Sequence, residues 1–143
     1  MEHIKGLRLV RRDKSEIEAE DFLREKEIIG FFFGNRLCPW CLGFTSYLDD
    51  IYVKLQKQGA SFEVILVSSD DREEGMFGYM DQMEIEWPAV PFGSDVRQKL
   101  AKLYDVKSTP ALIIVKNDGT VITTEGVDEV EEKEAEVFKE WSR

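Results

Sequence analysis

A short stretch of apolar residues at positions 28–33 predicts a strand that is buried on both faces of a sheet. Shortly after it, an amphipathic segment begins. Its apolar residues recur at i, i+3, i+4, i+7 and i+11, so they share one face of a helix that we expect over positions 39–57. They are Phe44, Tyr47, Leu48, Ile51 and Leu55. A strand that is apolar on both faces needs cover on both, so these two segments already predict a sheet with helices packed against it.

The remaining periodicities give the other elements. Strands are expected at 7–10, 62–67, 111–115 and 121–124, and helices at 19–24, 70–83 and 96–104. Residues 87–92 are expected to be extended, because each proline there disfavours the α conformation of the residue before it. Asn-Asp-Gly-Thr at 117–120 predicts a hairpin. A final helix is expected to carry Val130, Val137, Phe138 and Trp141 on one face. The order predicts an α/β fold, a mixed central β-sheet with helices on both faces.

Composition limits the class of protein. The 19 basic and 29 acidic side chains leave a formal net charge of −10, which argues against binding to nucleic-acid phosphates. A chain of 143 residues, 43% of them hydrophobic, is expected to form one domain, residues 1–143. The longest apolar stretch, Ile28–Gly34, is too short to cross a bilayer, so no membrane association is expected. Residues 1–6 lack the apolar core of a signal peptide, so we expect the protein in the cytoplasm, with the nucleus as a second compartment. We also expect it to be a monomer.

The two cysteines, Cys38 and Cys41, stand where the long helix is expected to begin. The thiolate is the nucleophilic form of cysteine, and the unpaired N–H groups of a helix N-terminus stabilise negative charge. Pro39 suits the first helical position, because its missing N–H leaves no hydrogen bond unmade there. Cys41 lies one turn further on, within reach of the Cys38 sulfur. We therefore expect Cys38 to be the exposed nucleophile that attacks a substrate disulfide, and the more buried Cys41 to resolve the mixed disulfide.

Other interpretations of the cysteine pair are weaker. A zinc site needs four ligands, and beyond the cysteines the chain offers only His3, far away in sequence, so no metal is expected. Cysteine-protease chemistry is excluded, because it needs a histidine base positioned beside the cysteine. The remaining alternative is that the two cysteines are buried core residues with no chemical function. The acidic residues of 125–140 are interpreted as the solvated face of the last helix, with a surface for a basic partner as the alternative.

Several landmarks extend these patterns along almost the whole chain. The most specific is the CxxC pair followed, just before a predicted strand, by Thr109 and Pro110. Others are Phe-Phe-Phe-Gly at 31–34, Trp-Pro-Ala-Val-Pro-Phe at 87–92, and the segments 6–13, 62–68, 104–110 and 119–123. In these landmarks the sequence resembles the thioredoxin superfamily, and within it the tryparedoxin and nucleoredoxin-like branch.

The resemblance implies a thioredoxin-like fold in which the Thr109–Pro110 peptide bond is cis and its loop lies beside the cysteines. It also implies that the backbone of Thr109 receives the substrate chain as an extra strand. A cis X–Pro bond is rare and usually holds a tight functional turn, which agrees with that role. We therefore assign Pro39, Trp40, Thr109 and Pro110 to substrate binding.

Two features depart from the pattern of the resembled proteins. The branch usually carries Trp before the first cysteine and Pro-Pro between the two, whereas here Leu37 precedes Cys38, and Pro39 and Trp40 lie between the cysteines. Trp40 is expected to take over the contact with the partner protein, or else to pack on the start of the helix. Phe32 stands where thioredoxins proper carry a buried acid that relays a proton to the second cysteine. Proton transfer to Cys41 is then left to water or to another group.

The sequence thus predicts a thiol–disulfide oxidoreductase that reduces protein disulfides through Cys38 and Cys41. No bound cofactor is expected, because the cysteines carry the electrons. The expected partners are protein disulfides and an upstream electron donor, either a reductase or a low-molecular-weight thiol. The alternative is a nucleoredoxin-like adaptor that binds a signalling partner and uses the CxxC pair as a redox switch without turnover.

Overall fold

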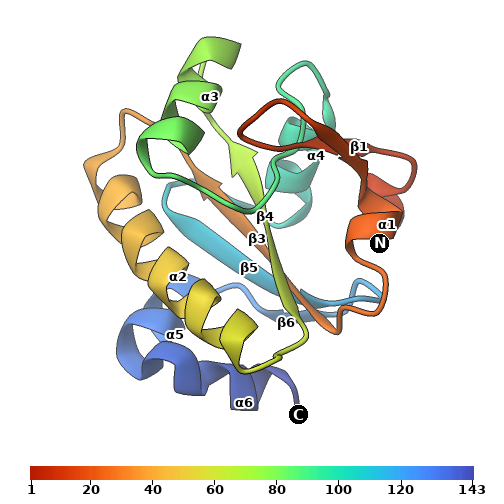
Figure 1. Ribbon diagram of the computed structural model, residues 1–143, viewed down its shortest axis with the longest axis vertical. Coiled ribbons are helices and arrows are strands. Elements are labelled where there is room, and N and C mark those ends of the chain that lie inside the picture. Colours follow the sequence, from red (N-terminus) through yellow and green to blue (C-terminus); the bar gives the residue numbers. More distant parts are fainter.

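A computed structural model describes residues 1–143 and places a four-stranded sheet at the centre of the molecule (Figure 1). The strand order is β4 (Phe62–Ser68), β3 (Ile28–Gly34), β5 (Ala111–Lys116) and β6 (Val121–Thr123). β3 pairs in parallel with β4 and antiparallel with β5, and β6 is antiparallel to β5. The sheet is therefore mixed, and the apolar stretch of the sequence forms an inner strand.

The central strands are buried on both faces, as the apolar stretch predicts. All seven residues of β3 are buried. Because successive side chains of a strand point to opposite faces, Ile28 and Phe32 enter one hydrophobic cluster, whereas Ile29, Phe31 and Phe33 enter a second. The neighbouring strands alternate in the same way, with Phe62, Val64, Leu66, Leu112 and Ile114 in the first cluster and Ile65, Val67, Ile113 and Val115 in the second.

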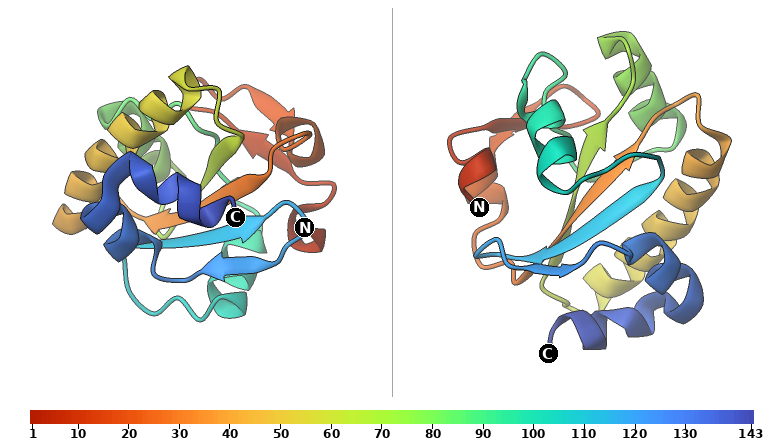
Figure 2. Two further views of the ribbon diagram at one scale, coloured as in Figure 1. Left: turned by 90° about the horizontal axis from the view of Figure 1, so that it is seen from below. Right: turned by 180° about the vertical axis from the view of Figure 1, so that it is seen from behind.

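Helices cover each of these clusters (Figure 2). The first cluster lies under α2 (Pro39–Lys57), α3 (Glu73–Gln82), α5 (Gly126–Lys133) and α6 (Val137–Trp141). The second lies under α4 (Val96–Leu103), α1 (Ala19–Phe22) and a 3-10 turn, η1 (Glu2–Ile4). The predicted arrangement of a mixed sheet with helices on both faces is confirmed.

The N-terminal segment extends the sheet beyond β4. β1 (Arg8–Val10) pairs antiparallel with β2 (Glu16–Glu18), a short, mostly exposed strand that the sequence did not predict. Ala89, in the expected extended segment, bridges Val10 on one side and Leu66 on the other. The prolines that flank Ala89 keep the segment extended, so it can pair where a helix would not fit.

The structure corrects two expected helices. The single last helix is wrong: α5 and α6 are separated by a 3-10 turn, η2 (Glu134–Glu136), whose first residue has a φ of 54°. The bend allows Val130 and Val137 to be buried with Trp141. The third helix begins at Glu73 and not at position 70. The Asp70 side chain instead accepts hydrogen bonds from the Ser68 hydroxyl, at the end of β4, and from the Arg36 N–H, which hold Asp70 in the loop after β4. None of the helices is both long enough and apolar enough to cross a membrane.

Candidate active site

Cys38 lies at the junction between the carboxyl end of β3 and the first turn of α2. It is the N-cap residue of the helix, and Pro39 occupies the first helical position. The Cys38 sulfur accepts a hydrogen bond from the Cys41 N–H at 3.2 Å, in the way that a serine or aspartate oxygen caps other helices. The first N–H groups of α2 and the helix dipole therefore act on this sulfur directly.

The loop before Cys38 is fixed by hydrogen bonds to the end of β4. The Asp70 carboxylate accepts from the Arg36 N–H at 2.9 Å. The Asn35 side chain accepts from the Leu37 N–H at 3.0 Å and donates to the Ser69 hydroxyl at 2.9 Å. These bonds tie the loop that leads to Cys38 to the segment after β4.

The loop that contains Thr109 and Pro110 lies against Cys38, 71 positions away in sequence. The Cys38 Sγ is 3.8 Å from the Thr109 carbonyl oxygen, and the Thr109 hydroxyl donates to that sulfur at 3.7 Å. The Thr109–Pro110 peptide bond is cis. The two segments that the sequence set apart as candidate site residues thus meet at one sulfur.

Cys41 lies beneath Cys38, with none of its surface exposed. The Thr45 hydroxyl donates to the Cys41 carbonyl oxygen at 2.6 Å, which uses its only proton. The short hydrogen bond between Thr45 and Tyr79 must therefore be donated by the Tyr79 hydroxyl. Gly34 makes room for this cluster, since a Cβ there would lie 3.0 Å from the Tyr79 oxygen and 3.4 Å from the Cys41 sulfur.

The two thiols differ in acidity. Partial burial raises the pKa of Cys38, but hydrogen bonds from the Cys41 thiol, the Thr109 hydroxyl and two helix N–H groups outweigh it, so its pKa lies below the ordinary 9.0. Burial, followed by the hydrogen bond to Cys38, raises the pKa of Cys41 to about 11. The arrangement therefore makes Cys38 the more readily ionised of the two, whereas Cys41 stays a thiol at neutral pH. Burial also raises the pKa of the Tyr79 hydroxyl, which therefore stays neutral.

Two large apolar side chains flank Cys38 and face solvent. Leu37 is 87% exposed and Trp40 is 81% exposed. Trp40 does not pack on the start of the helix, which was one of its two expected positions. It forms part of a groove of about 740 Å³ that also includes Pro39, Thr109 and Pro110. All four residues assigned to substrate binding therefore line one groove beside Cys38.

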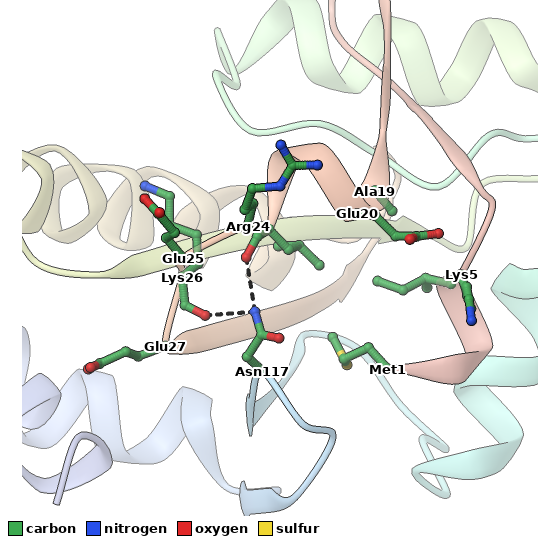
Figure 3. Close-up of a pocket in the computed structure, with 11 residues that line it drawn as sticks. Met1, Lys5, Ala19, Glu20, Arg24, Glu25, Lys26, Glu27 and Asn117 are labelled. Atoms are coloured by element: carbon green, nitrogen blue, oxygen red, sulfur yellow. Dashed lines mark hydrogen bonds between the residues drawn. The ribbon is translucent and has the colours of Figure 1, made fainter.

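A second hollow, of about 660 Å³, lies at the other end of β3 (Figure 3). It is lined by residues of the N-terminal segment, of the loop before β3 and of the β5–β6 hairpin. The Asn117 side chain donates to the carbonyl oxygens of Leu23 at 2.9 Å and Lys26 at 2.7 Å, and so ties the hairpin to that loop. No cysteine lines this hollow, and it contains none of the predicted site residues.

Sequence reasoning missed the polar residues beneath Cys41. Tyr79 and Thr45 belong to helices whose apolar stripes gave no reason to single out a hydroxyl, and their contact joins two helices that are far apart in sequence. Phe32, at the position of the missing acid, is fully buried against Phe44, with ring centroids 5.6 Å apart. No three histidine, cysteine or acidic side chains lie close enough together to hold a metal ion.

The fold and this dithiol site define a class, the thioredoxin-like proteins, and comparison with known proteins agrees. The thioredoxin-like family model matches residues 26–121, so the chain belongs to this family of oxidoreductases, in its tryparedoxin and nucleoredoxin-like branch. The predicted resemblance is confirmed.

The chain is similar both to nucleoredoxin-like proteins and to tryparedoxins. Human nucleoredoxin-like protein 1 is 32% identical over 136 residues; the match covers 91% of this chain but only 64% of that protein. The solved structure of thioredoxin related protein 16 from Carcinoscorpius rotundicauda is 41% identical and covers both chains in full, with a TM-score of 0.85. Tryparedoxin I from Crithidia fasciculata is 34% identical, with a TM-score of 0.82 and coverage of 94% of this chain and 91% of its own.

Proposed function

We propose that the protein reduces protein disulfides, with Cys38 as the nucleophile and Cys41 as the resolving thiol. One observation carries the proposal: the two sulfurs are in contrasting environments. Cys38 is partly exposed at a helix N-terminus with a lowered pKa, whereas Cys41 is buried with a raised pKa. A reactive thiolate and a protected second thiol are what a two-step exchange requires.

The exchange proceeds in two balanced steps. The Cys38 thiolate attacks one sulfur of the substrate disulfide, which forms a mixed disulfide and releases the other substrate sulfur as a thiolate that takes up a proton. Cys41 then loses its proton, and its thiolate attacks the Cys38 sulfur, which releases the second substrate thiolate. The substrate gains two electrons, and the protein is left with a Cys38–Cys41 disulfide that the electron donor must reduce.

The substrate chain is proposed to lie along the loop of Thr109 and Pro110. The Thr109 N–H makes no backbone hydrogen bond within the protein, so it is free to pair with an extended chain. The Thr109 carbonyl oxygen is 3.8 Å from the Cys38 sulfur, which would bring a disulfide in such a chain next to the nucleophile. Pro39 and Trp40 would contact the same chain from the other side of the groove.

The proposal includes an upstream electron donor, a reductase or a low-molecular-weight thiol, and action as a monomer in the cytoplasm or nucleus. Such compartments keep thiols reduced, which a dithiol reductant requires between cycles. No nucleic acid and no membrane are proposed as partners, in keeping with the net charge of −10.

Reduction of insulin disulfides by dithiothreitol tests the proposal. The wild-type protein should accelerate the reaction catalytically, and Cys38→Ser should abolish the acceleration. Cys41→Ser is the matched variant, because it removes a thiol from the same helix but leaves the nucleophile in place. Cys41→Ser should turn over more slowly than the wild type, because dithiothreitol must then release the mixed disulfide in place of Cys41. A wild-type rate equal to that of Cys38→Ser would contradict the proposal.

A redox-sensitive adaptor without turnover is the second candidate, and two observations favour it. The relative from Carcinoscorpius rotundicauda has a role in regulating the activity of the transcription factor NF-kB. Leu37 and Trp40 also expose apolar surface of the kind that protein partners cover. An adaptor would bind its partner in one redox state of the cysteine pair and would fail the insulin assay.

A further inference from the structure

The groove beside Cys38 has an acidic wall. We call it the Trp40 groove; Trp40, Tyr47, Pro110, Asp128 and Glu131 are among the residues that line it. It runs from the first turns of α2 to α5, which the fold brings together on the same face of the sheet (Figure 1). Glu134 extends the wall, because its carboxylate accepts a hydrogen bond from the Tyr47 hydroxyl at 3.2 Å.

No cation is paired with these carboxylates. No lysine or arginine lines the groove, and none of Asp128, Glu131 and Glu134 takes part in an ion pair. Asp128 lies in the first turn of α5, where a negative charge is favourable. Glu131 lies beyond that turn, three residues after Asp128, and like charges at this spacing destabilise a helix. The helix dipole therefore accounts for an acid at Asp128 but not for the one at Glu131.

The aromatic side chains of the groove suit the same kind of ligand. Trp40 is 81% exposed, and Tyr47 lines the groove from about two helical turns further along α2. The faces of tryptophan and tyrosine rings attract arginine and lysine side chains, most strongly when these are partly desolvated. An exposed tryptophan next to unpaired carboxylates therefore offers two attractions to one cationic side chain.

We infer that the Trp40 groove binds a basic segment of the substrate protein, with arginine or lysine side chains close to the disulfide that is reduced. The inference rests on the proposed function and names its substrate class. The groove lies next to the nucleophile, since the Thr109 carbonyl oxygen that is 3.8 Å from the Cys38 sulfur belongs to a lining residue. A cationic side chain held in the groove thus places the neighbouring disulfide at Cys38.

Two synthetic peptides test the inference. Both contain the same intramolecular disulfide, which is flanked by arginines in one peptide and by glutamates in the other. With dithiothreitol as the dithiol reductant, kcat/KM should be about three- to tenfold higher for the arginine peptide at low salt, given the modest strength of exposed charge pairs. The preference should shrink as added salt shortens the screening length.

A pair of triple variants separates the groove from the overall charge of the protein. Asp128→Asn with Glu131→Gln and Glu134→Gln should remove most of the preference. The matched control removes three exposed carboxylates outside the groove, by Glu2→Gln, Glu27→Gln and Asp50→Asn, and should keep it. Both variants are compared for folding by circular dichroism.

The possible outcomes separate the two proposals. Equal reduction of both peptides by the wild type, or equal loss of preference in the two triple variants, overturns the inference but leaves the proposed function standing. Reduction of neither peptide beyond the Cys38→Ser background overturns both. Cystamine, a small cationic disulfide, serves as a further probe. If the groove variant reduces cystamine and the arginine peptide with equal losses of rate relative to the wild type, the site selects a small cation and not a protein segment.

Discussion

The acidity difference between the two thiols predicts strongly selective alkylation of the reduced protein. The thiolate fraction falls tenfold for each pH unit below the pKa. At pH 7 a thiol with the ordinary pKa of 9.0 is about one part in 100 thiolate, and Cys38 exceeds this because its pKa is lowered. Cys41, with a pKa of about 11, is roughly one part in 10,000 thiolate.

The difference in rate is smaller than the difference in thiolate fraction. A more basic thiolate is intrinsically more nucleophilic. Over two pKa units this makes the Cys41 thiolate roughly tenfold more reactive than the Cys38 thiolate, which offsets part of its lower abundance. Iodoacetamide should therefore modify Cys38 at least about tenfold faster than Cys41. Burial of Cys41 widens the gap. Digestion and mass spectrometry after short reaction times give the two rates separately.

Two controls link this selectivity to the fold. In concentrated urea the two cysteines should react at similar rates, because the helix N-terminus and the burial are lost. Thr109→Val should slow the alkylation of Cys38 near neutral pH, since it removes the hydroxyl that donates to the Cys38 sulfur at 3.7 Å. Equal rates in the folded wild-type protein, or a faster Cys41, would refute the assignment of roles.

The cluster beneath Cys41 gives three further predictions. Tyr79→Phe should lower the free energy of unfolding by about 1 kcal/mol in urea denaturation, because the Thr45 hydroxyl loses its donor. Gly34→Ala should cost about 1–3 kcal/mol by the same measurement and slow the resolving step, since the added methyl group would crowd the Tyr79 oxygen and the Cys41 sulfur. Because the raised pKa of Cys41 favours the protonated thiol in the folded state, its contribution to stability is complete below pH 9 and is lost as the pH rises toward 11. The stability of the wild type relative to Cys41→Ser should therefore fall over that pH interval.

The sequence predicted those parts of the fold that depend on strict periodicity. The stretch at 28–33 is apolar on both faces, so it fits only an inner strand. The apolar residues of α2 share one face only if the segment is helical. The prediction of a single last helix was wrong because periodicity does not reveal a bend. Val130, Val137 and Trp141 keep helical spacing, but they are buried across a bend at Glu134 that depends on tertiary packing.

The reactive cysteine was predictable because its environment is local. Cys38, Pro39 and Cys41 create the capped helix N-terminus by themselves. The residues around Cys41 were not predictable, since Tyr79 reaches Thr45 from another helix, and Gly34 contributes only by the absence of a side chain. The position of Thr109 beside Cys38 came from the resemblance to known proteins and not from any local pattern.

Trapping of a covalent intermediate tests the central claim most directly. In Cys41→Ser the resolving thiol is absent, so a mixed disulfide formed at Cys38 has no internal route to release. After exposure of this variant to a protein disulfide, mass spectrometry should find the substrate attached to Cys38. Cys38→Ser, treated identically, should carry no adduct, because its remaining thiol is buried and has a raised pKa. Equal trapping by Cys38→Ser, or no adduct on Cys38 in Cys41→Ser, would contradict the two-step mechanism.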